Sequence, residues 1–167
     1  MANPDVAFGF EATPLLRARP YLVGSTNATI LYINDVVMAT ATGLLESGTA
    51  GSTLILGSSL GYLKVSTESR HPVADHPDQE FHAQDDGAGT TAAQTHIHTQ
   101  MDHVVTAGST YTRLSGHELD ISDTKKAAAG FKIVDFVQNP EYSIGANSIF
   151  RCIAVEHILK VGTGTGI

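Results

Sequence analysis

The chain has 167 residues, of which 42% are hydrophobic and only 16% are charged, so it can bury one core and lacks the composition of a disordered protein. Its net charge of −7 and its ten scattered Lys and Arg residues argue against direct nucleic-acid binding, which needs clustered cations. The opening residues lack the pattern of a signal peptide, and no apolar run approaches the roughly 18 residues of a membrane span. We therefore expect a protein that is made in a cytoplasm and does not contact a membrane.

The first 27 residues have neither a helical nor a strand period. They contain Pro4, Pro14 and Pro20, each of which fixes φ and removes a backbone donor. Residues 1–27 are therefore expected to form an extended N-terminal arm. Five apolar residues of this arm need a partner: Val6, Phe8, Phe10, Leu15 and Leu16. The sequence leaves open whether they pack on the chain's own core or on a neighbouring subunit.

Residues 28–161 are predicted to form a single β domain, because short runs rich in β-branched and aromatic residues alternate with Gly, Asn, Asp and Ser. The expected strands cover residues 28–33, 36–38, 53–56, 60–65, 79–84, 117–121, 130–137 and 148–158. In the run that starts at His117, apolar Leu119 and Ile121 alternate with polar residues, which indicates a half-buried strand. This spacing is typical of an all-β fold, a small β-barrel or β-sandwich of short antiparallel strands.

Several shorter features complete the expected architecture. Residues 36–46 are the best candidate for a helix although they lack an apolar stripe, and a single helical turn is possible near residues 90–94. Residues 85–87, Asp-Asp-Gly, fit a turn. Cys152, the only cysteine, lies in an apolar run and is expected to be a buried small hydrophobe. Residues 162–167 alternate Gly and Thr, which predicts a flexible tail.

The histidines suggest a metal site. On a strand, His96 and His98 would lie on the same face, and Asp102 and His103 follow closely. Two strand histidines and a carboxylate resemble the metal-binding signature of cupins. The glutamate and the glycine framework of that signature are missing, so we expect solvated histidines and keep a cupin-like metal-binding enzyme that uses His96, His98 and Asp102 or His103 as the alternative. Binding of a metal or a proton at a symmetry axis, with one histidine from each subunit, is a third option.

A second set of histidines is interleaved with acidic residues between residues 71 and 82. Its members are His71, Asp75, His76, Asp78, Glu80 and His82. Their spacing matches no known cation-binding loop. Neither a His-Glu-x-x-His motif nor a Walker-type Gly-Lys-Ser/Thr motif occurs in the sequence, and no Gly-x-Ser-x-Gly nucleophile elbow is expected. We therefore expect no enzyme activity, and we assign no catalytic, cofactor-binding or metal-binding residue.

Both ends of the chain resemble a family of tailed-bacteriophage head proteins, the capsid decoration or cement (head stabilisation) proteins. Residues 1–10, MANPDVAFGF, resemble the start of that family, and residues 114–120, LSGHELD, resemble its LSG-x-ELD segment. Residues 136–147, FVQNPEYSIGAN, resemble its VQ-x-P-x-N-x-x-G-A turn, and the final strand and the Gly/Thr tail also fit. Residues 73–81 and 84–87 are similar more loosely.

The resemblance implies a structural virion protein. Such a protein binds the outer surface of a phage head, is made in the host bacterial cytoplasm, and stabilises contacts between major capsid subunits. The implied partners are the major capsid protein and further copies of this chain, as a homo-oligomer, with a trimer ahead of a dimer. A virion-surface module that binds glycans is a further alternative. The absence of Trp and an aromatic content of 7% argue against it.

Overall fold

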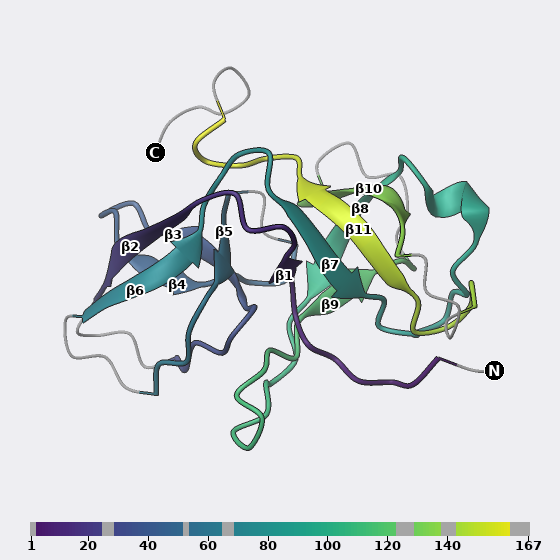
Figure 1. The fold of residues 1–167 in the computed structure, drawn as a ribbon, viewed down its shortest axis with the longest axis horizontal. Coiled ribbons are helices and arrows are strands. Elements are labelled where there is room, and N and C mark those ends of the chain that lie inside the picture. Colours follow the sequence, from purple (N-terminus) through teal and green to yellow (C-terminus); the bar gives the residue numbers. More distant parts are fainter. Residues whose placement is uncertain are drawn as a thin grey trace.

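The computed structural model describes residues 3–24, 29–51, 54–64, 69–122, 129–137 and 143–160. Within these ranges the chain contains strands and one short 3-10 helix but no α-helix, so the predicted all-β class is confirmed. Five strands close into a barrel and six others form a sheet, and the two lie side by side (Figure 1).

The barrel is built from the first part of the chain. Its strands follow the order β2-β4-β3-β5-β6 around the barrel. Their bounds are β2 (Ala18–Val23), β3 (Val36–Ala39), β4 (Leu45–Ser47), β5 (Ile55–Ser59) and β6 (Ser69–Ala74). Its interior is filled by branched aliphatic side chains, namely Val23, Leu31, Val37, Leu45, Leu56 and Val73. Closure removes the free strand edges that an open sheet of this size would expose.

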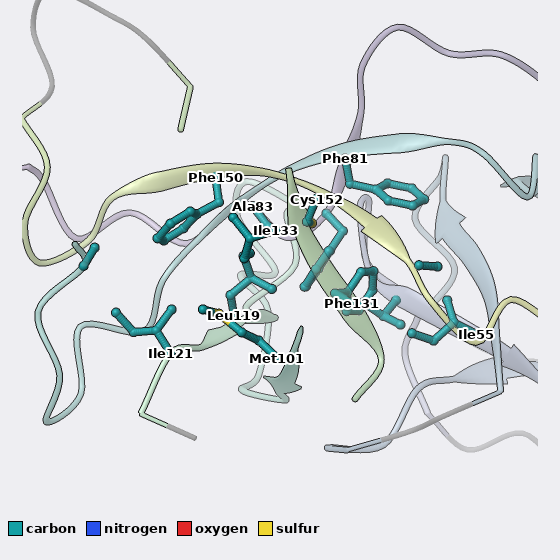
Figure 2. Close-up of a cluster of buried hydrophobic side chains, with 14 residues drawn as sticks. Ile55, Phe81, Ala83, Met101, Leu119, Ile121, Phe131, Ile133, Phe150 and Cys152 are labelled. Atoms are coloured by element: carbon teal, nitrogen blue, oxygen red, sulfur yellow. The ribbon is translucent and has the colours of Figure 1, made fainter. Parts of the chain in front are cut away.

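The second part of the chain, with one short strand from the N-terminal segment, forms an antiparallel sheet of order β1-β7-β11-β10-β8-β9. Its strands are β1 (Glu11–Ala12), β7 (Glu80–Gln84), β8 (Gln100–Val104), β9 (Glu118–Asp120), β10 (Phe131–Phe136) and β11 (Ile149–Ala154). Figure 2 shows the sheet's apolar side chains pointing toward one another, with Ile55 of β5 at one end of the cluster. Because Val36 and Ile55 belong to barrel strands, the barrel and the sheet share this core.

Phe10 anchors the N-terminal segment in the same core. Its side chain is fully buried and stacks on Phe131 with ring centroids 4.4 Å apart, and Phe81 lies edge-on at 6.5 Å. The expected extended arm over residues 1–27 is therefore wrong in its second half, since β1 and β2 are integral strands. Pro20 of β2 lies opposite Pro72 of β6, so the two missing backbone donors fall at the same place in the ladder.

The remaining expectations are met in part. The strands expected over residues 36–38, 53–56, 79–84, 117–121, 130–137 and 148–158 overlap β3, β5, β7, β9, β10 and β11. Where 28–33 and 60–65 are described, they contribute only isolated bridges, such as Leu31 with Leu63. The helix considered over 36–46 is instead the hairpin β3–β4, which turns at Gly43 with φ of 78°. Cys152 is fully buried as expected, whereas residues 162–167 lie outside the described residues.

Candidate functional site

His96, His98, Asp102 and His103, the four residues of the alternative metal centre, do not converge. His96 ends the 3-10 helix Gln94–His96, where its Nδ1 accepts a hydrogen bond of 3.0 Å from the Ala93 backbone N–H. His98 follows with φ of 66°, so the prediction that His96 and His98 share one face of a strand is wrong. The cause is local, because the His96 ring and the Thr99 hydroxyl bond to nearby backbone groups and hold a tight turn.

Asp102 and His103 are successive residues of β8, so their side chains leave opposite faces of the strand. The Asp102 carboxylate accepts a hydrogen bond of 3.3 Å from the Gly130 backbone, whereas the His103 ring packs edge-on against Phe10 and Phe131. Across the described ranges no three His, Cys, Asp or Glu side chains are arranged to hold a metal ion.

The second histidine set is also dispersed. The His76 Nδ1 accepts a hydrogen bond from the Asp78 backbone in a turn, and His82 lines a shallow hollow beside Arg151. Asp75 is fully buried and serves the barrel: it accepts hydrogen bonds from the Arg17 guanidinium at 2.8 Å and from the Tyr21 hydroxyl at 2.6 Å. Burial and the bond to Asp75 raise the pKa of Tyr21 to about 12.

A serine–histidine pair, which the sequence analysis did not single out, lies at the end of β5. Gly57-Ser58-Ser59-Leu60-Gly61 has the Gly-x-Ser-x-Gly pattern of a nucleophile elbow, and the Ser59 Oγ lies 2.6 Å from the His71 Nε2. In hydrolases that serine sits exposed on a sharp turn between a strand and a helix. Here Ser59 is fully buried and belongs to the strand, and its hydroxyl also donates to the Gly61 carbonyl at 2.8 Å. The hydrogen bond from Ser59 to Gly61 closes a turn at the end of the strand.

Asp35, His103 and His117 form a buried polar group where the barrel meets the sheet. Neither ring nitrogen of His103 has a hydrogen-bond partner among the described residues, and burial lowers the pKa of this histidine to about 4. His117 accepts a hydrogen bond from the Val36 backbone, and its Nε2 lies 3.5 Å from an oxygen of Asp35. Burial lowers the pKa of His117 to about 3 and raises that of Asp35 to about 6. At neutral pH both imidazoles are therefore uncharged.

Part of the N-terminal segment packs on its own chain through the buried Phe10, whereas Val6, Leu15 and Leu16 are exposed. The Asn3 side chain donates to the carbonyls of Ser143 and Ala146 at 2.8 and 3.0 Å. The Gln84 side chain donates to the Pro4 carbonyl at 2.8 Å and accepts from the Val6 backbone at 3.0 Å. Residues 3–10 are thus fastened by polar contacts at the start and by Phe10 at the end.

The buried carboxylate of Asp85 joins the end of β7 to the loop before β11. Asp85 is fully buried and accepts hydrogen bonds from the backbone N–H groups of Gly87, Asn147 and Ser148 at 2.9, 3.1 and 2.6 Å. The Asp86 backbone donates to the Leu119 carbonyl at 3.1 Å. No backbone turn is assigned at residues 85–87, where one was predicted: Asp85 forms a bridge with Leu119 of β9, and Gly87, with φ of 61°, donates to the Asp85 side chain.

The described surface carries several exposed apolar side chains. Val6 and Ile144 are 59% and 53% exposed, consecutive Leu15 and Leu16 are 50% and 51% exposed, and Tyr111 is 95% exposed. Burying such side chains against a partner would be favourable at about 25 cal/mol per Å² of apolar surface.

Comparisons with known proteins give no assignment. No protein-family model, curated protein or solved structure matches the chain. Within the described residues, no helix is long and apolar enough to span a membrane.

Proposed function

We propose that this chain is a structural virion protein, a capsid decoration protein that binds the outer surface of a phage head and stabilises contacts between major capsid subunits. The observation that carries the proposal is the position of the segments that resemble that family. They are far apart in sequence, yet residues 3–10, 84–87, 114–120 and 143–147 contact one another around Asp85. The segments that resemble the family therefore lie close together in the fold.

The physical properties of the molecule suit such a role. A shell that holds packaged DNA is under pressure, and a subunit that bridges a seam adds buried interface there. Many copies acting together give avidity, so each interface can be modest. A closed barrel that shares a core with a sheet offers a rigid body for this purpose, and exposed Leu15 and Leu16 offer apolar surface for contact between copies. A homo-oligomer, a trimer ahead of a dimer, belongs to this proposal.

The test is the composition of purified virions. Virions of the phage that encodes the chain should contain it in a fixed ratio to the major capsid protein, and image reconstruction should place it on the outside of the head. Its presence only in lysates of infected cells, and never in gradient-purified virions, would overturn the proposal. The geometry of the described residues gives no support to a cupin-like enzyme. Elemental analysis of untagged protein checks that alternative, which predicts a stoichiometric transition metal.

A further inference from the structure

Residues 105–116, which make up most of the connection between β8 and β9, protrude from the molecule. In Figure 1 they form the green loop that extends away from both the barrel and the sheet. Tyr111 near its tip is 95% exposed, although a tyrosine ring is largely apolar and is seldom left wholly in water. Contact with a partner would explain why this tyrosine is exposed on a protruding loop.

The base of this loop is fixed to the barrel side of the molecule. The Ile33 backbone N–H donates to the Arg113 carbonyl, and the Ser115 N–H donates to the Ile33 carbonyl, both at 2.9 Å. Gly108 lies so close to the Tyr32 ring and the Leu114 carbonyl that a Cβ at this position would overlap them. The Arg113 guanidinium lies 5.4 Å from the centre of the Tyr62 ring, within the range of a cation–π contact.

The tip is closed by its own hydrogen bonds. The Ser109 N–H donates to the Leu114 carbonyl at 2.9 Å, and the Arg113 N–H donates to the Ser109 carbonyl at 2.7 Å. The Ser109 hydroxyl accepts from the Thr112 backbone at 3.2 Å. The loop is therefore pre-organised, and a partner that binds Tyr111 would not bear the full entropic cost of ordering a flexible segment.

The charge of the loop differs from that of the whole chain. Arg113 is the only charged residue between positions 105 and 116, whereas the chain has a net charge of −7. The loop therefore presents an aromatic side chain and a cation on an acidic molecule. Tyrosine and arginine are also the residue types enriched among the few side chains that dominate the energy of protein interfaces.

We propose that residues 105–116 form a docking loop whose Tyr111 enters an apolar pocket on the major capsid subunit, with an acidic group at the pocket rim near Arg113. This inference rests on the proposed function and names the contact that serves it. A second copy of this chain is a poorer match. A hollow lined by His82, Asp135, Phe136, Val137 and Arg151 already contains the Arg151 guanidinium, paired with Asp135.

The experiment uses phage heads that lack the protein, purified from a deletion mutant, and the full-length chain with a fluorescent label. Binding is measured by co-sedimentation over a range of protein concentrations. Tyr111→Ala should weaken binding by about 30-fold, the size typical of an interface hot spot. Thr110→Ala, at a neighbouring exposed position, is the matched control and should bind as the wild type does. Tyr111→Phe should retain most of the affinity, because the ring supplies most of the buried surface.

The outcomes separate this inference from the proposed function. If the wild-type chain does not bind heads, the proposed function fails and the capsid partner fails with it. If the wild type binds and Tyr111→Ala binds equally well, the docking loop is wrong while the function stands. Sedimentation of the free proteins gives the last outcome: a change of oligomeric state in Tyr111→Ala would make the loop a contact between copies and would also overturn the inference. Circular dichroism should show that the variants are folded.

Discussion

Replacing His103 with leucine should stabilise the protein. The His103 side chain is 1% exposed and lies among Phe10, Phe131 and His117, with no hydrogen-bond partner among the described residues for either ring nitrogen. An unpaired buried polar group costs about 1–3 kcal/mol. His103→Leu removes this cost at nearly constant volume. The free energy of unfolding at pH 7.5 is therefore expected to rise by about 1–2 kcal/mol.

The same substitution should also change the pH dependence of stability. Burial lowers the pKa of His103 to about 4 in the folded state, against an ordinary value of 6.5. The unfolded chain therefore binds a proton as the pH falls below 6.5 while the folded chain does not, so the folded state loses stability toward acid. From these two pKa values, His103 accounts for a loss of about 2 kcal/mol between pH 7.5 and pH 5. The leucine variant lacks this loss.

Urea denaturation at several pH values, followed by circular dichroism, measures both effects. Met101→Leu is the matched control, because Met101 is a buried residue of the same strand, and its stability curve should run parallel to that of the wild type. The difference between two curves cancels the contributions of other titrating groups. Parallel curves for His103→Leu and the wild type, or a loss of more than about 1 kcal/mol at pH 7.5, would refute the reasoning.

Three further predictions concern other parts of the fold. Phe10→Ala should destabilise the protein by about 3–5 kcal/mol in urea denaturation and expose residues 3–10 to proteolysis, and native-like stability would show that this segment is not anchored. Burial of the carboxyl group and, after it, the negative charges of Asp5, Asp86 and Asp85 raise the pKa of Glu118 from 4.5 to about 7. The contribution of Glu118 to stability therefore falls as the pH rises from 4.5 to 7. Glu118→Gln should lessen that fall by about 1–2 kcal/mol, and an unchanged slope would contradict it. Ser59 should resist labelling by a fluorophosphonate because it is fully buried, and stoichiometric labelling would identify a reactive serine.

The sequence was a good guide where side-chain type and environment agree. The strands β10 and β11 are rich in aromatic and β-branched residues, and these residues contribute to the core of the sheet. It was a poor guide where tertiary pairing outweighs local preference. Pro20 and Pro72 argue against strands, yet β2 and β6 place them opposite each other. From the sequence, Asp102 and His103 of β8 are expected to face solvent, but both are buried in the folded chain.

The candidate site was harder to predict than the fold. The spacing of His96 and His98 implies a shared face only on a strand, and the local bonds of the His96 ring select a 3-10 turn instead. Gly-x-Ser-x-Gly is visible in the sequence, but the burial of Ser59 is a property of the folded barrel. Likewise the contacts around Asp85 join segments more than 60 positions apart, and no local pattern could have brought them together.

The claim that the chain reinforces a phage head is tested most directly by the temperature at which heads release their DNA. Heads from the deletion mutant would be heated with and without the purified chain, and release followed with a DNA-binding dye. We predict that the added chain raises the release temperature until the effect saturates at a fixed ratio of chain to major capsid protein. A variant that fails to bind should leave the release temperature at the value of heads without the chain. An unchanged release temperature at saturating occupancy would contradict the account.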